Sequence, residues 1–214
     1  MAVLGQLSTF FQGWAGLNTA DVARSLRQLQ KAGLLPARRG AGETAVSVDH
    51  AIWLLLTLLG GSVEKAREIA RMPNSRQALN GTIINEGDPA MTVFDGIRDA
   101  INLRRSGSIA LAADFRLAEL GGSFSATIGC QSILQQSLPD LPAGSRASWN
   151  FTFGRPVELA GPDPCFWRLS VVNADAIDSL ASLFGPLTVT QGEPLDMYPV
   201  PTTTPARYQA VTVH

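Results

Sequence analysis

The sequence predicts an α+β fold, in which a helical N-terminal half precedes a mixed α+β C-terminal half. Hydrophobic residues up to about residue 106 recur at intervals of three and four, the spacing of amphipathic helices. After Gly107 the chain contains runs of strand-forming residues separated by glycine and proline. Because 45% of the 214 residues are hydrophobic and 16% are charged, the composition argues against a wholly disordered chain.

Helix start and stop signals divide the N-terminal half. Thr19 is a suitable N-cap for the second helix, Gly33 a C-cap, and Pro36 prevents continuation. Ser47 or Asp49 caps the third helix, which stops before Gly60-Gly61. The predicted helices cover residues 3–14, 20–32, from 47 or 49 to 59, from 62 onwards, and 89–105.

The C-terminal half is predicted to contain four strands and one helix. The strands cover residues 108–117, 123–134, 149–153 and 166–172, and the helix covers residues 175–184. The last thirty residues hold five prolines, which favours an extended, partly ordered tail. We therefore expect a helix-turn-helix head over residues 1–61, a helical connector or oligomerisation region over 62–106, and an α+β domain with a Pro-rich tail over 107–214.

The second predicted helix has one basic face. On a helix, Val22, Leu26 and Leu29 fall within about 60° of one another and form a buried stripe. The opposite side carries three cations and an amide: Arg24, Arg27, Gln28 and Lys31. Such side chains can donate to base edges in the major groove or hold phosphates. The face predicts a DNA-reading helix, and the alternative is an ordinary solvated surface helix.

A basic, glycine-rich loop follows that helix. Arg38 and Arg39 stand before Gly40 and Gly42, so the main chain can approach phosphates and the two arginines can bind them. The net charge of the whole chain is −1, but residues 1–39 contain five basic residues and one acidic residue. This uneven distribution is typical of a small DNA-binding head on an acidic body. A linker without a binding role is the alternative for the loop.

The segment 28–55, QLQKAGLLPARRGAGETAVSVDHAIWLL, resembles the DNA-binding head of MerR-like and winged-helix regulators. In those proteins a recognition helix ends in a similar turn, a basic wing follows, and an acid-capped helix packs behind. The segment lacks the tyrosines of the MerR pattern. It is also similar to the heads of phage and prophage proteins and to phage small terminase subunits. The resemblance implies double-stranded DNA as partner. The residues expected to bind it are those of the basic helix face and the loop: Arg24, Arg27, Gln28, Lys31, Arg38 and Arg39.

The third predicted helix is apolar nearly all round, so it must be buried on more than one side. Burial within one chain is the simpler interpretation. Packing against a second subunit is the alternative, and a homo-oligomer, preferably a dimer, would let two heads read two half-sites. The C-terminal half remains a candidate protein-interaction module, and its aromatic residues are explained more simply by a strand core than by a ligand pocket.

The sequence offers little to catalysis or metal binding. Cys130 and Cys165 are not in a C-x-x-C motif, and we expect buried core thiols. His50 opens an apolar helix, where a structural role is expected. No hydrolase, metalloprotease or dinucleotide motif occurs. Without a readable signal peptide or membrane span, we expect a cytoplasmic bacterial or phage DNA-binding protein, a transcriptional regulator or a packaging subunit, with no enzymatic activity and no cofactor or metal.

Overall fold

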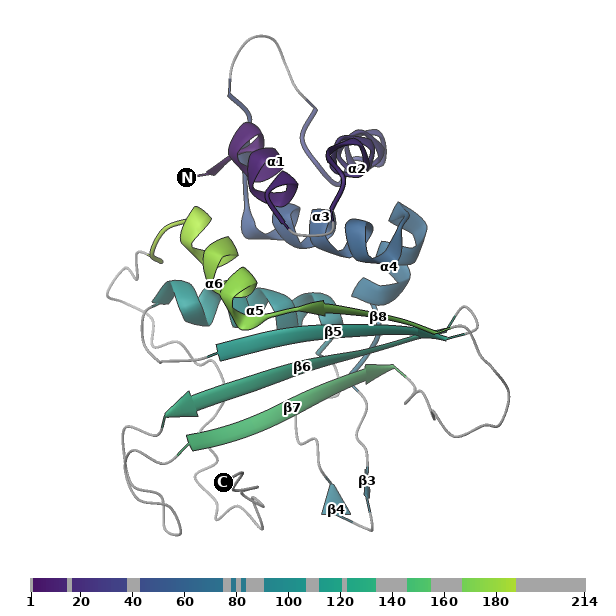
Figure 1. Cartoon of the computed structure of the whole chain (residues 1–214), viewed down its shortest axis with the longest axis vertical. Coiled ribbons are helices and arrows are strands. Elements are labelled where there is room, and N and C mark those ends of the chain that lie inside the picture. The colour runs from purple at the N-terminus through teal and green to yellow at the C-terminus, as the bar shows by residue number, and fades with distance from the viewer. Residues whose placement is uncertain are drawn as a thin grey trace.

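The computed structural model describes residues 2–14, 17–37, 43–74, 78–79, 82–83, 91–106, 112–120, 123–133, 146–154 and 167–187. Within these ranges six helices accompany a four-stranded antiparallel sheet, so the protein has an α+β fold as predicted. Figure 1 shows α1 and α2 at one end of the molecule, α3 and α4 in the middle, and the sheet beyond them, next to α5 and α6.

The four N-terminal helices follow the predicted order. They are α1 (Leu4–Gln12), α2 (Thr19–Lys31), α3 (Val48–Gly60) and α4 (Val63–Ala70). The N-cap of α2 is Asn18 rather than the predicted Thr19, because the Asn18 side-chain oxygen accepts the Ala20 N–H at 2.9 Å. Ser47 caps α3 and Ser62 caps α4, as their hydroxyl groups predict.

A short ribbon joins the N-terminus to the segment before α3. Strand β1 (Ala2–Val3) pairs antiparallel with β2 (Ala45–Val46), and the Leu4 N–H donates to the Thr44 carbonyl at 2.8 Å. Ala2 and Val46 are buried, so the ribbon belongs to the core. Sequence analysis missed it because two-residue strands are too short to show an alternating pattern.

The main sheet consists of β5 (Ala112–Leu120), β6 (Ser123–Ile133), β7 (Arg146–Gly154) and β8 (Trp167–Val172). Its order is β7-β6-β5-β8, and every neighbouring pair is antiparallel. After β7 the chain therefore crosses to the opposite edge of the sheet to form β8. Two further short strands, β3 (Ala78–Leu79) and β4 (Thr82–Ile83), pair with each other.

One face of the sheet is covered by α5 (Val93–Ser106) and α6 (Ala174–Leu183). Register places Ile128 and Val172 on either side of Phe115, and all three side chains are buried. Ile97 and Ile101 of α5 and Ile177 of α6 are equally buried above them. Alternating apolar residues in the strands and a 3.6-residue period in the helices produce this layer.

Helix α5 begins at Val93 and not at the predicted residue 89. Asp95 and Thr92 form a reciprocal cap: the Asp95 carboxylate accepts the Thr92 N–H at 3.2 Å, and the Thr92 hydroxyl accepts the Asp95 N–H at 3.3 Å. This pair is a capping box, with the acid three residues after the cap. The cap therefore fixes the first turn of α5 at Val93.

Helix α3 lies at the centre of the helical half. Eight of its residues are buried, and Trp53, Leu58 and Leu59 pack partly buried against the same core. One chain therefore encloses this apolar helix, which supports the simpler of the two interpretations. The core cluster includes Ala2 at one end of the described chain and Phe184 at the other.

Candidate nucleic-acid interface

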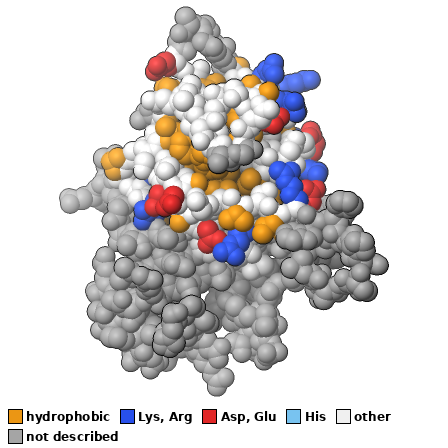
Figure 2. Space-filling view, in the orientation of Figure 1, with side chains coloured by type: hydrophobic (Ala, Val, Ile, Leu, Met, Phe, Trp, Pro, Cys, Tyr) orange, Lys and Arg blue, Asp and Glu red, His pale blue; other side chains and the backbone are white. Residues whose placement is uncertain are grey.

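The exposed face of α2 contains all four residues that the sequence singles out on this helix. Val22 and Leu29 are fully buried, Leu26 is partly buried, and Ser25 is also buried beside them. The four predicted residues are all exposed: Arg24, Arg27, Gln28 and Lys31. Figure 2 shows basic side chains gathered over α2. The structure thus presents three cations and one amide together to solvent.

These polar side chains form few hydrogen bonds or ion pairs within the protein. Arg24 forms an exposed ion pair with Asp21, with 3.3 Å between Arg24 Nη1 and Asp21 Oδ1. The Nε of Arg27 donates to the Ala23 carbonyl at 3.3 Å, which holds the stem of Arg27 along its own helix. Within the described residues, Gln28 and Lys31 have no side-chain partner. Donors on this face are therefore available to a ligand.

Three other cations of the described chain form ion pairs that join different elements. Lys65 of α4 pairs with Glu119 of β5 at 2.6 Å, and Arg104 of α5 pairs with Asp178 of α6. Arg98 of α5 binds Asp49 at the start of α3, at 2.9 Å. These pairs join different elements of the fold. Within the described residues the cations of α2 form no ion pair with another element, a property that they share with Arg67, Arg71 and Arg168.

The C-terminus of α2 is fixed by a Schellman motif. Gly33 has φ +72°, its N–H donates to the Gln30 carbonyl, and the Leu34 N–H donates to the Leu29 carbonyl at 2.9 Å. The Gln30 side chain then donates to the Pro36 carbonyl at 3.2 Å, and Leu35 is buried. The chain therefore leaves α2 in a defined direction. Arg38 and Arg39 follow this turn and lie outside the described residues.

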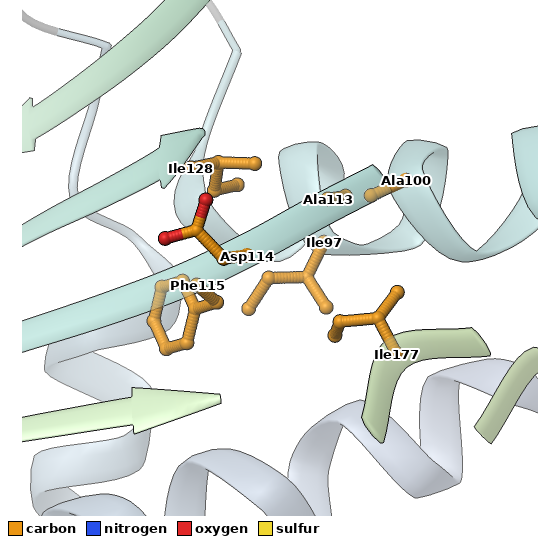
Figure 3. Close-up of a pocket in the computed structure, with 7 residues that line it drawn as sticks. All are labelled: Ile97, Ala100, Ala113, Asp114, Phe115, Ile128 and Ile177. Carbon is orange, nitrogen blue, oxygen red and sulfur yellow. The ribbon is translucent and has the colours of Figure 1, made fainter. Parts of the chain in front are cut away.

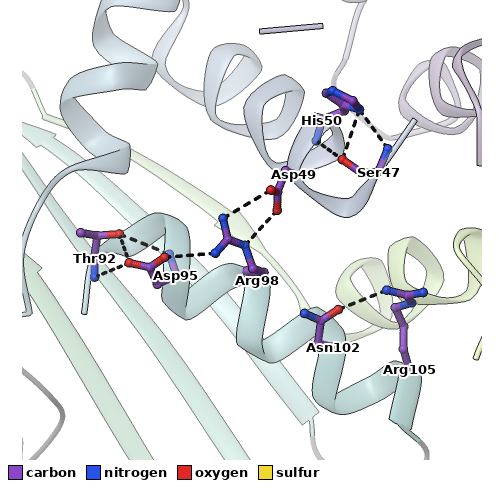
Figure 4. A network of polar contacts seen from close by, with 8 residues as sticks. All are labelled: Ser47, Asp49, His50, Thr92, Asp95, Arg98, Asn102 and Arg105. Carbon is purple, nitrogen blue, oxygen red and sulfur yellow. Dashed lines mark hydrogen bonds and ion pairs between the residues drawn. The ribbon is translucent and has the colours of Figure 1, made fainter. Parts of the chain in front are cut away.

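The chain that returns toward α3 is fixed as well. It enters the β1–β2 ribbon at Ala45, and Ser47 and His50 then cap α3 reciprocally (Figure 4). The Ser47 N–H donates to His50 Nδ1 at 2.9 Å, and the Ser47 hydroxyl accepts the His50 N–H at 3.4 Å. Segment 36–43, which contains the predicted wing, therefore connects two points that are anchored to the core.

Burial lowers the pKa of His50, although the adjacent Asp49 carboxylate acts in the opposite direction. The hydrogen bond favours the same neutral state, because a protonated Nδ1 could not accept the Ser47 N–H. His50 is therefore neutral at pH 7 and carries its proton on Nε2. This assigns the residue the structural role that its position predicts.

Figure 4 also shows how α3 is joined to α5. The Arg98 guanidinium reaches both Asp49 oxygens and contacts Asp95 one turn earlier in its own helix. It also lies 4.9 Å from the centre of the Phe94 ring, which packs on Trp53. The network holds the helical end of the molecule on the layer that covers the sheet.

A small depression between α5, α6 and the sheet is lined by apolar side chains, including Ile97, Ile128 and Ile177. Figure 3 shows the one acidic lining residue, Asp114, with its carboxylate pointing away from Ile97 and Ile177. Asp114 pairs instead with Arg116, at 2.7 Å. The depression is a packing junction rather than a site with converging polar groups.

Among the described residues, no group of three or more His, Cys, Asp or Glu side chains could hold a metal ion. No described helix has the length and apolarity needed to cross a bilayer. Cys130 lies in β6, and Cys165 falls outside the described residues. Because the structure does not describe the side chain of Cys130 either, the predicted burial of the two thiols is not tested.

Comparison with known proteins adds no family. No protein-family model, curated protein or solved structure matches the chain significantly. The MerR-like character of segment 28–55 therefore stays a prediction from its residues.

Sequence analysis did not find two features of this site. The ion pair between Asp21 and Arg24 was not predicted, because Asp21 was considered only for its contribution to the net charge. An acidic and a basic residue three positions apart on a helix are nevertheless neighbours. The tie from Gln30 to the Pro36 carbonyl depends on the turn geometry after α2, which residue spacing does not reveal. Both features restrain groups around the predicted DNA-binding face.

Proposed function

We propose that the protein binds double-stranded DNA, with α2 placed in the major groove and Arg38 and Arg39 on the adjacent phosphates. The observation that carries the proposal is the exposed face formed by three cations and an amide, whose opposite side is packed into the core. A rigid helix with such a face can present several donors to base edges and phosphates at once.

The arrangement of the first three helices supports the helix-turn-helix hypothesis: the short helix α1 precedes α2, and the core helix α3 lies behind it. Residues Gly13 to Asn18 connect α1 to α2, and α2 packs on both α1 and α3. The segment after α2 leaves and returns at anchored points, as a wing requires. Under this hypothesis the wing is the basic segment 36–43. We therefore infer that the protein is a bacterial or phage transcriptional regulator with a winged helix-turn-helix head.

A DNA-binding assay with paired charge variants tests the proposal. Fluorescence anisotropy at low salt is measured with a random-sequence duplex and the full chain. Arg27→Ala combined with Lys31→Ala should weaken binding at least about tenfold, and should flatten the plot of log affinity against log salt by about two. Both positions are exposed on a helix, where alanine preserves helix formation, so the fold should persist.

Arg71→Ala combined with Arg116→Ala is the matched control. It removes the same charge from two exposed positions outside α2. The control should lose clearly less affinity than the α2 variant, because neither side chain lies on the proposed DNA-binding face. If the unmodified protein does not bind, or if both variants lose affinity equally, DNA reading by α2 is wrong.

Arg38→Ala combined with Arg39→Ala tests the wing separately. Affinity should fall by a similar factor for every duplex sequence, because phosphate contacts carry no sequence information. A loss confined to one sequence would instead place these arginines on base edges. No loss for any sequence would remove the loop from the interface and leave α2 as the contact.

The alternative hypothesis, a phage packaging subunit, has the same DNA-binding head but a different number of subunits. A small-terminase-like subunit would form a ring of many copies, whereas a regulator of palindromic sites needs two. Light scattering on the full chain distinguishes them. We propose the regulator because two copies suffice for paired half-sites.

A further inference from the structure

We propose that Gln30 is a positioning residue of the DNA interface, which holds the chain after α2 so that Arg38 and Arg39 act together with the helix. The inference rests on the proposed function and deepens it, because it explains what keeps the two basic parts of the interface in one arrangement. Gln30 is not among the residues expected to contact DNA. It acts through the Pro36 carbonyl.

Gln30 lies beside the basic face of α2 and not on it. Its side chain is partly buried, whereas Gln28 is exposed and has no side-chain partner within the described residues. Residues three and four apart on a helix are neighbours, so position 30 lies at the border between the partly buried Leu26 and the exposed Arg27. The two glutamines therefore differ in surroundings: Gln28 faces solvent, and Gln30 faces the turn that ends the helix.

Backbone hydrogen bonds hold the first part of the turn after α2. The N–H groups of Leu34 and Leu35 both donate to the Leu29 carbonyl, at 2.9 and 3.3 Å, and the Leu35 side chain is buried. Pro36 has no N–H to donate. Within the described residues, the bond from Gln30 Nε2 to the Pro36 carbonyl, at 3.2 Å, is the last hydrogen bond between this turn and α2.

The bond to Pro36 is close enough along the chain to control the arginines that follow. The Pro36 carbonyl belongs to the peptide unit that leads to Ala37, so holding this oxygen restrains the plane of that unit. A peptide chain advances at most about 3.3–3.6 Å per residue, so position 38 is at most about 7 Å from position 36 in any backbone conformation. The direction set at Pro36 therefore decides on which side of the end of α2 the basic segment begins.

The contribution of Gln30 to affinity is preorganisation. Without its amide, the peptide unit after Pro36 can adopt more directions in the free protein, and binding must then order it. Ordering a backbone segment on association costs conformational entropy, which lowers affinity although no contact with the ligand is removed. The loss should appear only when Arg38 and Arg39 take part in binding, because it is their position that the bond controls.

A double-mutant cycle tests this role with Gln30→Met, which keeps the length of the side chain and a high helix propensity but removes the donor. Affinity of the full chain for a random-sequence duplex is measured by fluorescence anisotropy at low salt. Gln30→Met should weaken binding about three- to tenfold in the parent protein. In the variant that carries Arg38→Ala and Arg39→Ala it should weaken binding less than about twofold, because the groups that it positions are gone.

Two further variants separate positioning from a general effect on the fold. In a background with Arg27→Ala and Lys31→Ala, Gln30→Met should still weaken binding about as much as in the parent, since Arg38 and Arg39 are present. A purely structural contribution would instead weaken binding by the same factor in every background. Gln12→Met in α1 is the matched control: its amide donates to the Ser8 hydroxyl of the same helix at 3.2 Å, and its loss should leave affinity unchanged.

Amide hydrogen exchange detects the same bond without DNA. In Gln30→Met, the N–H groups of Leu34 and Leu35 should exchange several-fold faster than in the parent, because their turn loses its last hydrogen bond to α2. This change should exceed any change in the amides of α3, which the core encloses. Equal changes in both places would show that Gln30 stabilises the whole fold, and would overturn a local positioning role.

Two results of the affinity cycle would overturn the role of Gln30 and leave DNA binding in place. One is full affinity of the Gln30→Met protein, and the other is an equal loss of affinity in the variant that lacks Arg38 and Arg39. A parent protein that binds no duplex would overturn the proposed function, and the role of Gln30 with it. The affinity of the parent therefore tells the two failures apart.

Discussion

Gly96 of α5 lies so close to Ile128 of β6 that a β-carbon at position 96 would stand 2.7 Å from the Ile128 Cδ1 atom and 3.1 Å from Phe153 Cζ. Both neighbours are buried, and Phe153 is fully enclosed. The missing side chain thus sets how closely the helix approaches the sheet. A glycine that costs helix propensity is retained here for packing.

Gly96→Ala should therefore lower the free energy of unfolding by about 1–3 kcal/mol, the usual cost of forcing an extra methyl group into a packed core. Urea denaturation measures the change. The control is Gly5→Ala in α1, where a β-carbon meets nothing within 4 Å, and which should be neutral or stabilising. Equal behaviour of the two variants would contradict the close packing of α5 on β6.

Gly33→Ala should destabilise the end of α2 for a different reason. The position has φ +72° and open space around its α-carbon, so the expected cost of about 1–2 kcal/mol comes from the left-handed backbone alone. Gly33→Asn should cost less, because asparagine tolerates this conformation. Thermal unfolding compares the two, and an alanine variant as stable as the parent would show that the turn can rearrange.

These two glycines show what sequence could and could not predict. Gly33 follows a helical pattern and precedes Pro36, so its capping role was readable from local chemistry. Gly96 sits inside a helix, and its role depends on β6, which is distant in the chain and unknown until the sheet is formed. Helix and strand order followed from periodicity, whereas sheet order, with β8 beside β5, depends on pairings that periodicity does not encode.

The candidate site shows the same division. The exposure of Arg27 and Lys31 followed from 3.6-residue spacing, because the apolar stripe fixes which side of α2 faces the core. The anchoring of the loop at the β1–β2 ribbon could not be predicted from this spacing. The ribbon pairs residues more than forty positions apart through two strands of two residues each. DNA binding itself stays a prediction.

His50 predicts a pH dependence of stability. Its pKa is lower in the folded protein than in the unfolded chain. As the pH falls below about 6.5, the unfolded chain therefore binds the proton first, and the folded state loses stability. Above about pH 7.5 the contribution of His50 to the free energy of unfolding is constant. His50→Gln should abolish this slope and keep the cap, because a glutamine oxygen at the third helical position can accept the Ser47 N–H.

Urea denaturation of both proteins at about pH 5.5 and about pH 8 measures this difference. The parent should lose more stability than the glutamine variant on acidification, and carboxylates common to both cancel in the comparison. His50→Ala serves as the control for the cap, and it should lower stability at both pH values by about 1 kcal/mol. Identical pH profiles of the parent and the glutamine variant would show that His50 does not titrate differently on folding.

The Asp21–Arg24 pair gives a prediction about affinity. On the proposed DNA-binding face, the Asp21 carboxylate both holds Arg24 at 3.3 Å and would stand near phosphates, which it repels. Asp21→Asn should therefore tighten binding to a random duplex by a few-fold at low salt, with the effect fading as salt screens the charges. Asp175→Asn, at the exposed start of α6, removes an equal charge elsewhere and should leave affinity unchanged. Weaker binding by Asp21→Asn would instead mean that the ion pair positions Arg24 for its contact, and an effect equal to that of Asp175→Asn would place the DNA away from α2.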